Sequence, residues 1–361
     1  MKVTEKRRLG ESDVHVTALG LGGAALGNLY ERVDDRSASG AVAMALQLGV
    51  GYFDTAPYYG YGLSEERLGK ALYEEDRSQL VISTKVGRLL VPRKGGARDD
   101  QGFVGARAFD PVFDYSYDGV LRSLESSLER LRTDHVEVLL MHDIGARTHG
   151  EAHHGEIFGA AIEGGYRAMR RLRDEGVVGA IGLGVNETEV CVEALGRADF
   201  DCFLLAGRYT LLEQAALDRL LPLCQERGAS IIVGGPFNSG VLVEGEVDGE
   251  VEGEVEGKGE AKAKAKGTSK HYDYQVANQE ILDRVSRLRE VCTAHDVPLP
   301  AAALQFPLHH PAVAAVIPGA RTPAEVEANA GWLETDIPQA LFQDLRSAEL
   351  LRPDAPIGFR E

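Results

Sequence analysis

The sequence lacks the long apolar segments and the excess of positive charge that several classes of protein require. No stretch approaches roughly 18 uninterrupted apolar residues, so no transmembrane helix is expected. There are 39 Lys and Arg residues against 56 Asp and Glu residues, which gives a formal net charge of −17. Nucleic acids and anionic membranes favour basic surfaces, so neither is expected as a partner. The N-terminus has charged residues but no apolar signal segment, and a cytoplasmic location is therefore expected.

Cysteine is also scarce, and its spacing does not indicate disulfides or a zinc site. The four cysteines form no C-x-x-C pair and lie far apart, which predicts reduced thiols at Cys191, Cys202, Cys224 and Cys292. Two adjacent histidine pairs, His153-His154 and His309-His310, have no further ligands at metal-binding spacing, so no metal site is expected. Hydrophobic residues make up 44% of the chain, enough for a sizeable globular core.

Short apolar runs of β-strand type alternate with amphipathic helical patterns along most of the chain. Parallel strands with right-handed crossovers follow from this alternation, and eight such units fit a closed barrel better than an open sheet. We therefore predict an α/β fold of the (β/α)8 (TIM) barrel type, with residues 1–361 as a single domain. The predicted strands are 18–21, 51–54, 80–84, 136–141, 179–183, 202–205, 231–233 and 314–317.

Two of the helical patterns between these strands are especially clear. One has a single apolar stripe at positions i, i+4, i+8 and i+11, formed by Val120, Leu124, Leu128 and Leu131. The other is predicted to begin at Ser64 as N-cap, with Glu65 and Glu66 in its first turn. Its apolar residues Leu68 and Leu72 are predicted to face inward.

Three segments depart from the alternation and predict long loops after strands three, four and seven. Residues 87–111 contain proline and glycine, and residues 143–156 also separate a strand from its helix. Residues 243–270 begin with four tandem tetrapeptides of the form V-E/D-G-E/K and continue as alternating Ala and Lys. So few large apolar side chains cannot offset the entropy of ordering, so residues 243–270 are predicted to be a disordered insert. A tolerated surface insertion is favoured over a functional lid.

Reactive side chains follow three consecutive predicted strands. Asp54 ends the second strand, Tyr59 lies in the loop beyond it, Lys85 follows the third strand and His142 follows the fourth. Because the carboxyl ends of parallel barrel strands form one rim, these side chains are predicted to meet there.

Those four residue types together suit proton transfer. A phenol with a pKa near 10 is a poor acid or base at neutral pH. A lysine beside it would lower that pKa, and a carboxylate would hold the lysine charged and in place. Lys85 and Asp54 are predicted to fill these roles, leaving Tyr59 as proton donor or acceptor, while His142 orients a carbonyl or hydroxyl oxygen.

The run D-T-A-P-Y-Y-G-Y-G-L-S-E from Asp54 to Glu65, followed by Leu68-Gly69, resembles the signature of the aldo-keto reductase family. The resemblance covers almost the whole chain apart from the insert. It implies a catalytic tetrad with Tyr59 as general acid or base, made of Asp54, Tyr59, Lys85 and His142.

Three further segments resemble one branch of that family, the D-threo-aldose 1-dehydrogenases and their fucose-, galactose- and pyridoxal-oxidising relatives. They are FDYSYDG at 113–119, LAGRYTLL at 205–212 and VPLPAAALQF at 297–306. This branch implies NAD(P)-dependent oxidation of a sugar at its anomeric carbon to a lactone, with a small-molecule sugar or aldehyde as partner.

Two glycine patterns invite a dinucleotide-binding reading at different places. The pattern G-x-G-x-x-A from Gly20 to Ala25 matches a Rossmann fingerprint, which needs a helix to follow at once. Here Gly27, Asn28 and two aspartates interrupt, so Gly22 is predicted instead to let the chain turn beneath a ligand at the barrel rim.

The stronger dinucleotide signal follows the eighth strand. Thr322 as N-cap, Pro323 at the first helical position and Glu325 two residues later predict a capping box that starts a helix. A helix N-terminus beside a small-residue turn suits a phosphate group, and Arg321 adds positive charge.

The resemblance implies the remaining cofactor contacts. The loop 236–242 would cover the pyrophosphate, Tyr209 would stack on the nicotinamide and Asn186 would hold its carboxamide. The predicted cofactor-binding set is Gly22, Asn186, Tyr209, Pro236, Phe237, Ser239, Gly240, Gly319, Ala320, Arg321, Glu325 and Asn329.

The choice between NAD and NADP depends mainly on Glu325. NADP-preferring relatives often carry arginine at this position, and lysine and serine where Gly319 and Ala320 stand. A carboxylate would repel a 2′-phosphate and accept a hydrogen bond from a 2′-hydroxyl, which favours NAD. Two observations keep NADP open: Glu325 also serves as the capping-box residue, and Arg321 can bind phosphate.

Three functions remain open from the sequence. The favoured one is oxidation of an aldose at C1 with Tyr59 as general base. The second is NADPH-dependent reduction of an aldehyde or ketone, including pyridoxal-type substrates. The third, from another class, is a cofactor-sensing regulatory subunit with little turnover.

Overall fold

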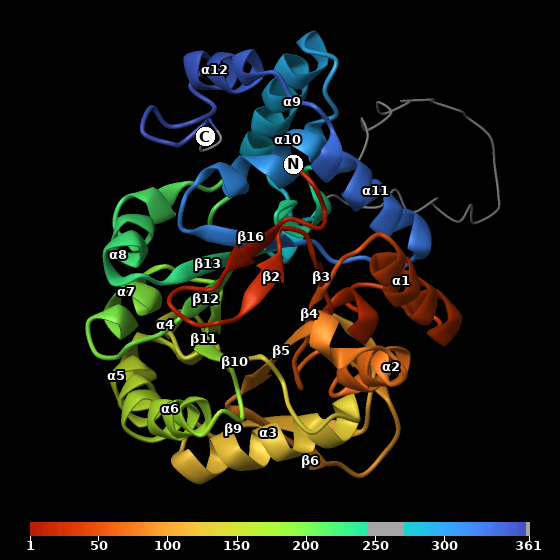
Figure 1. Cartoon of the computed structure of the whole chain (residues 1–361), viewed down its shortest axis with the longest axis vertical. Coiled ribbons are helices and arrows are strands. Elements are labelled where there is room, and N and C mark those ends of the chain that lie inside the picture. The colour runs from red at the N-terminus through yellow and green to blue at the C-terminus, as the bar shows by residue number, and fades with distance from the viewer. Residues whose placement is uncertain (244–270, 359–361) are drawn as a thin grey trace, which may run out of the picture.

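A closed barrel of eight parallel strands forms the centre of the protein (Figure 1). The computed structural model describes residues 1–243 and 271–358, so the predicted disorder of the insert falls, except for Val243, outside the described residues. Bridges from Leu19 to Val316 and from Gly22 to Gly319 join the two end strands, β3 and β16, and confirm the predicted barrel. The strands are β3 (Gly20–Gly22), β4 (Tyr52–Asp54), β5 (Val81–Val86), β10 (Val138–His142), β11 (Ala180–Val185), β12 (Cys202–Ala206), β13 (Ser230–Gly234) and β16 (Val313–Ile317).

Each predicted strand overlaps one of these, with ends that differ by at most two residues. Side chains alternate between two apolar clusters because successive residues of a strand point to opposite faces. Val138 and Leu140 of β10 belong to the cluster inside the barrel, whereas Leu139 and Met141 belong to the cluster between strands and helices. Leu9, next to the antiparallel pair β1 (Lys6–Arg8) and β2 (His15–Thr17), also belongs to the inner cluster.

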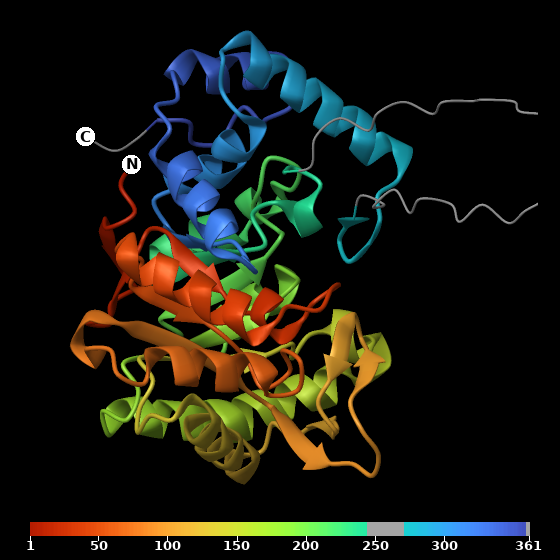
Figure 2. The same ribbon diagram turned by 90° about the vertical axis from the view of Figure 1, so that its right-hand side faces the viewer.

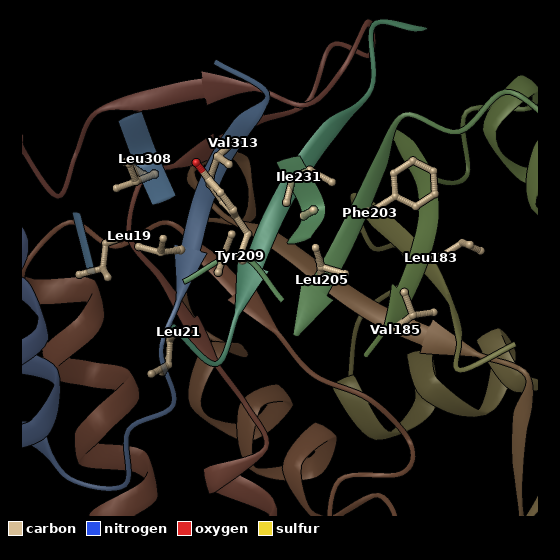
Figure 3. Close-up of a cluster of buried hydrophobic side chains, with 14 of the residues drawn as sticks. Leu19, Leu21, Leu183, Val185, Phe203, Leu205, Tyr209, Ile231, Leu308 and Val313 are labelled. Atoms are coloured by element: carbon tan, nitrogen blue, oxygen red, sulfur yellow. The ribbon is translucent and has the colours of Figure 1, made fainter. Parts of the chain in front are cut away.

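Figure 3 shows part of the outer cluster. Leu183 and Val185 of β11, with Phe203 and Leu205 of β12, point away from the barrel interior toward the surrounding helices. Apolar burial on this scale is the main favourable term in folding, at about 25 cal/mol per Å². This burial explains why strands with apolar residues on both faces form the barrel, which is covered on its inside by one cluster and on its outside by the other.

Helices surround the barrel on its outer side (Figure 1). The predicted stripe Val120, Leu124, Leu128 and Leu131 lies on α3, where all four side chains are buried or pack against the core. The helices are α1 (Asp35–Gln47), α2 (Leu63–Leu72), α3 (Tyr117–Leu131), α6 (Arg167–Asp174), α7 (Glu189–Leu195), α8 (Leu220–Arg227), α9 (Gln279–Ala294), α10 (Leu299–Gln305), α11 (Pro323–Glu334) and α12 (Gln339–Ser347).

The loops after β5 and β10 have secondary structure of their own. The loop after β5 contains the antiparallel pairs β6 (Arg88–Pro92) with β9 (Phe109–Phe113) and β7 (Arg98–Asp100) with β8 (Phe103–Ala106). Figure 2 shows part of this loop extending beyond the barrel. The loop after β10 contains α4 (Ala146–His149) and α5 (Glu151–Ala160), which runs into a π-helical turn (Ala161–Tyr166). After β13 come the 3-10 turn η5 (Asn238–Gly240) and, beyond the insert, the hairpin β14 (His271–Tyr272) and β15 (Gln275–Val276).

The start of α2 differs from its prediction. Gly62, not Ser64, is the N-cap, and it adopts the left-handed φ of 91° that glycine tolerates. Ser64 is buried inside the first turn, where its hydroxyl donates to the carbonyl of Gly23 at 2.7 Å and accepts from the hydroxyl of Thr55 at 2.9 Å. The prediction was wrong because Ser64 joins α2 to the loop after β3 instead of capping the helix. Leu68 and Leu72 are buried as predicted, together with other α2 residues.

For the described residues, the structure shows no Rossmann site at the early glycines, no disulfide and no helix suited to crossing a membrane. The G-x-G run lies in β3, but it is followed only by the 3-10 turn η1 (Ala25–Gly27), and α1 begins only at Asp35, so no α-helix directly follows the strand as a Rossmann site requires. All four cysteines are buried and free, which confirms the prediction of reduced thiols. Among the described residues, no helix is both long and apolar enough to cross a bilayer.

His309 gives the fold a predictable sensitivity to acid. It is 5% exposed in the turn η6 (Phe306–His309), with its ring 4.7 Å from that of Phe342. Burial, assisted by the charge of Arg7, lowers its pKa to about 4, against about 6.5 in the unfolded chain. Between these pH values only the unfolded chain gains this proton, so stability is lost as the pH falls from 6.5 toward 4. At about 1.4 kcal/mol per pKa unit, the loss amounts to about 3 kcal/mol.

Urea denaturation at a series of pH values tests this expectation. The free energy of unfolding of the His309→Leu variant is expected to fall less steeply between pH 6.5 and 4 than that of the parent protein. His142, whose pKa is also lowered by burial, contributes in the same sense and remains in both proteins. Equal slopes in the two proteins would contradict the assignment to His309.

Candidate active site

A buried ion pair at the rim joins the ends of β4 and β5. Lys85 Nζ lies 2.7 Å from the carboxylate Oδ2 of Asp54, and the two side chains are 1% and 2% exposed. Ser83 donates to the other carboxylate oxygen at 2.7 Å, and Lys85 also donates to the carbonyl of Thr55 at 2.9 Å. Every charge in this pair therefore has a partner, as burial of charge requires.

Tyr59 lies next to the Lys85 side of this ion pair. Lys85 Nζ donates to its hydroxyl oxygen at 3.1 Å and also lies 4.6 Å from the centre of its ring. Burial raises the pKa of Tyr59 well above its usual value, as do the carboxylates Asp54 and Asp143, while the charge of Arg88 lowers it. Burial outweighs the expected lowering by lysine, so Tyr59 is a neutral phenol, the form that can donate a proton.

His142 lies beside Tyr59 at the end of β10. Its ring makes an edge contact with the ring of Tyr59, 6.1 Å between centres, and a similar one with Tyr58. Burial lowers the pKa of His142 well below its usual value, and the charges of Arg88 and Lys85 act in the same direction. A neutral imidazole can hydrogen-bond an oxygen atom without carrying charge into the site. The structure thus brings together all four side chains of the predicted tetrad.

A second buried ion pair, absent from the sequence-based prediction, adjoins His142. The guanidinium of Arg88 donates to Asp143 Oδ2, and Asp143 Oδ2 lies 3.5 Å from His142 Nε2. The guanidinium also lies over the rings of Tyr58 and Phe113, at 3.9 and 4.9 Å. The one signal available in the sequence was the adjacency of a carboxylate to the predicted histidine, His142-Asp143.

The turn between β14 and β15 connects to the loops that follow three of the barrel strands. Asp273 pairs with Arg147 at 2.9 Å, after β10, and with Arg208 at 2.7 Å, after β12. Tyr274 donates its hydroxyl to Asn186, after β11, at 3.1 Å. A cavity of about 350 Å³ lies beside this junction and is lined by Arg147, Asn186, Arg208 and Asp273, among others. Sequence analysis missed the turn because no pattern relates it to those loops.

Asn186 already has protein partners at the rim. Its amide nitrogen donates to Asp143 at 3.3 Å, and its backbone carbonyl accepts from Arg208 at 2.7 Å. Asn186 is half-buried and directly follows β11, at the rim where it was predicted to bind the carboxamide of the nicotinamide. That contact stays a prediction.

The predicted phosphate seat lies where β16 meets β3. Gly22 and Gly319 pair across this junction, and Ala320 is fully buried beside it. Thr322 accepts from the backbone nitrogen of Glu325 at 3.2 Å, which confirms the predicted N-cap of α11. The helix N-terminus therefore faces the rim with its partial positive charge.

The carboxylate of Glu325 does not complete the capping box as expected. It accepts from the backbone nitrogen of Arg321 at 2.7 Å, one residue before the N-cap, and pairs with the Arg321 guanidinium at 3.2 Å. Glu31, from the loop after β3, also pairs with that guanidinium. Arg321 thus has two carboxylate partners. Asn329, further along α11, is 5% exposed.

The loop after β13 is folded tightly around η5. Ser239 has a left-handed φ of 62°, and its hydroxyl accepts from the backbone nitrogen of Tyr274 at 3.2 Å. Phe237 packs edge-on against Trp332 of α11, 5.7 Å between ring centres. Pro236 and Gly240 flank these two residues. The loop is therefore held against the C-terminal half of α11, and its predicted contact with the pyrophosphate stays a prediction.

The structure contradicts the predicted role of Tyr209. Its side chain has no exposed surface and packs against Phe306 and His310, 5.3 and 5.7 Å between ring centres. Figure 3 shows it among the apolar side chains of the outer cluster, near Leu308. A ring with no free face cannot stack on a nicotinamide.

Small residues at the rim suit a flat ring instead. Gly184 of β11 lies beside Lys85. A Cβ atom added to Gly184 would lie 2.9 Å from Lys85 Cε. Gly207 and Gly235 follow β12 and β13 in left-handed conformations, with φ of 65° and 55°. These glycines and the α11 N-terminus are suited to a flat ring and to a phosphate group, and their contact with a nicotinamide dinucleotide stays a prediction.

Comparison with known proteins agrees with this arrangement. The sequence pattern of the Aldo/keto reductase family matches residues 18–349, which include every strand of the barrel. The chain belongs to the aldo/keto reductase family. It is therefore an oxidoreductase of a family that uses nicotinamide dinucleotides and acts on small molecules.

Two curated aldo/keto reductases are similar over nearly their whole length. Pyridoxal 4-dehydrogenase from Microbacterium luteolum is 41% identical over 360 residues, covering 97% of this chain and 99% of its own. D-threo-aldose 1-dehydrogenase from Pseudomonas sp is 37% identical over 340 residues, covering 93% and 95%. These relatives match the branch of the aldo/keto reductase family that the sequence resembles.

Solved aldo/keto reductase structures share the fold. The holo form of aldo-keto reductase AKR11C1 from Bacillus halodurans has a TM-score of 0.67 at 28% identity and covers 99% of this chain and 98% of its own. The glycerol dehydrogenase AKR11B4 from Gluconobacter oxydans has a TM-score of 0.71 at 20% identity, covers 99% of each chain, and supports the fold alone.

Proposed function

We propose that this aldo/keto reductase oxidises an aldose at C1 to the lactone, with Asp54, Tyr59, Lys85 and His142 as its catalytic residues. The observation that carries the proposal is the position of Lys85, which bonds both Asp54 and the Tyr59 hydroxyl inside a buried rim. The 37% identity to a D-threo-aldose 1-dehydrogenase supports the substrate class.

Each side chain has a distinct part in this mechanism. Tyr59, as the phenolate, accepts the proton of the C1 hydroxyl and becomes a neutral phenol. The charge of Lys85 stabilises that phenolate. Asp54 keeps Lys85 charged and fixed. Neutral His142 hydrogen-bonds the same substrate oxygen and orients it. A nicotinamide dinucleotide would be held by the glycines of the rim and the α11 N-terminus and would supply the hydride acceptor.

The pH at which each direction is catalysed fastest depends on the protonation of Tyr59. Burial raises the pKa of Tyr59, so its acid form dominates at neutral pH and suits reduction. Oxidation needs the basic form, which becomes more abundant as the pH rises. This property favours aldehyde or ketone reduction as a second candidate function, and 41% identity to a pyridoxal 4-dehydrogenase favours pyridoxal as a second candidate substrate.

A substrate panel distinguishes these candidates. Purified protein is assayed with L-fucose, D-arabinose, L-galactose and pyridoxal, each with NAD and NADP, at neutral and alkaline pH, by absorbance of the reduced nicotinamide. Reduction of pyridoxal is assayed separately with NADH and NADPH. Sugar oxidation that increases with pH is the expected result. Aldehyde reduction without sugar oxidation would replace the proposal by the reductase, and tight dinucleotide binding without any turnover would indicate a regulatory subunit.

The charges around Arg321 predict a preference for NAD over NADP. One guanidinium faces two carboxylates, Glu31 and Glu325, so this group has an excess negative charge. A 2′-phosphate would add a charge of about −1.5 to −2 beside it. We expect kcat/KM to be at least about tenfold higher with NAD. The double variant Glu31→Gln/Glu325→Gln is expected to reduce that ratio by about tenfold, worth about 1.4 kcal/mol.

The matched control for this variant is Glu327→Gln, which removes a charge from an exposed position of the same helix. It is expected to leave the NAD to NADP ratio within about twofold, because screening weakens exposed charges. A higher kcat/KM with NADP than with NAD in the parent protein would contradict the prediction.

A further inference from the structure

The proposed proton transfer does not use the ion pair of Arg88 and Asp143. Each residue is 7% exposed, and the two lie next to the oxygen-binding side chains of the rim. Asp143 Oδ2 is 3.5 Å from His142 Nε2, and Arg88 lies over the ring of Tyr58 at 3.9 Å. A substrate whose reacting oxygen lies between Tyr59 and His142 would place its neighbouring atoms beside this pair.

The backbone at Asp143 is held in an unusual conformation. Its φ of 51° is left-handed, which costs free energy for a residue other than glycine. Its nitrogen donates to the carbonyl of Gly184 at 3.0 Å, and its carbonyl accepts from the hydroxyl of Tyr115 at 3.0 Å. His149 lies 3.0 Å from the same carbonyl. Several neighbours therefore fix a conformation that aims the carboxylate along the rim.

Stability alone is a weak explanation for this pair. A buried ion pair loses the hydration of both charges and is often no more stable than apolar side chains of the same size. Among the described residues, two buried polar atoms at this place also have no hydrogen-bond partner: Nε of Arg88, within the pair, and Nδ1 of His142, next to it. Buried groups of this kind are costly unless a ligand satisfies them.

We propose that Asp143 and Arg88 bind the hydroxyl group on the substrate carbon next to the one that reacts. The carboxylate of Asp143 accepts the hydrogen bond of that hydroxyl, and the guanidinium of Arg88 donates to its oxygen. In an aldose oxidised at C1 this group is the C2 hydroxyl, so the pair selects substrates with adjacent oxygens. The choice of sugar rests on the proposed function, whereas the selection for an α-hydroxyl group does not.

A pair of substrates that differ in one hydroxyl tests the proposal. The parent protein is assayed with D-arabinose and with 2-deoxy-D-erythro-pentose, its 2-deoxy analogue. A site built to bind a hydroxyl discriminates strongly against the analogue that lacks it, so kcat/KM is expected to be about 10²-fold higher for D-arabinose. In Asp143→Asn this ratio is expected to fall by tenfold or more. A ratio that Asp143→Asn leaves unchanged would overturn the proposal.

Two further variants separate recognition from folding. Asp201→Asn is the matched control, because Asp201 pairs with Arg173 at 2.8 Å and caps the backbone of β11 at the opposite end of the strands. It is expected to lower the melting temperature but to keep the substrate ratio. Arg88→Lys keeps the positive charge and loses the planar fork, and it is expected to lower the ratio in the same sense as Asp143→Asn. It provides the decisive measurement if Asp143→Asn does not fold, and an unchanged ratio in Arg88→Lys then overturns the proposal.

A parallel assay keeps the two hypotheses distinguishable. If the parent protein oxidises no sugar, the proposed function fails, and the same comparison is made in the reductive direction with lactaldehyde and propanal. A preference for lactaldehyde that Asp143→Asn reduces by tenfold or more supports the Arg88–Asp143 site. An equal loss on both aldehydes overturns it.

Discussion

Tyr59→Phe is expected to lower kcat by about 10³-fold in both reaction directions, because general acid–base catalysis contributes about 10²- to 10⁴-fold. The substitution removes only the hydroxyl that Lys85 contacts at 3.1 Å and keeps the ring that packs beside His142 and Phe103. Binding of the dinucleotide is therefore expected to change little. Steady-state kinetics with the best substrate of the panel, and cofactor titration by protein fluorescence, measure the two effects.

Tyr61→Phe provides the matched control for this loss. Tyr61 belongs to the same aromatic cluster, is 1% exposed, and its hydroxyl is hydrogen-bonded to Asp100. Removing that hydroxyl is expected to change kcat by less than about threefold and to lower the free energy of unfolding by no more than about 1 kcal/mol, the usual net contribution of one hydrogen bond. A Tyr59→Phe variant that retains more than about a tenth of the activity would exclude Tyr59 as the proton-transfer group.

Breaking the ion pair of Asp54 and Lys85 is expected to have the largest effect on stability. Removal of one partner leaves the other as an uncompensated buried charge, at a cost of about 3–5 kcal/mol. Asp54→Asn and Lys85→Met are each expected to lose this amount in urea denaturation. The double variant Asp54→Asn/Lys85→Met removes both charges and is expected to recover most of the stability but none of the activity.

The comparison between the single and double variants separates the structural and chemical roles of this pair. The three variants together give the interaction free energy between Asp54 and Lys85, which single substitutions cannot measure. A double variant as unstable as the weaker single variant would show that the neighbouring bonds from Ser83 and to Thr55 dominate. A double variant with substantial activity would contradict the proposed use of Lys85.

The sequence predicted the barrel well because its signal is repeated eight times. Each strand is a short apolar run, and an error at one boundary changes neither the alternation nor the closure. The start of α2 was predicted wrongly for a physical reason. Ser64 followed by two glutamates has the local pattern of an N-cap, but its partners, Gly23 and Thr55, belong to other loops. Tertiary contacts of this kind are not encoded in local sequence.

The candidate site was predictable only where residues stand at strand ends. Asp54 and His142 end β4 and β10, and Lys85 is the second-last residue of β5, so the barrel rim brings them together. Tyr209 lies in a loop, and nothing in its neighbourhood indicated that the ring would turn into the outer apolar cluster. The Arg88–Asp143 pair depends on the conformation of two loops, including a left-handed residue, which no periodic pattern indicates.

The hydrogen bond between Ser239 and Tyr274 determines how easily the segment between them can change in length during evolution. This bond fastens the chain before and after residues 244–270 to the same place, with η5 beside β14. Whatever the conformation of those residues, they close a loop whose ends are already held together. The entropic cost of such a loop grows with the logarithm of its length, about 0.6 kcal/mol for each doubling. Evolution can therefore lengthen or shorten this segment at little thermodynamic cost while the rim beneath it stays in place.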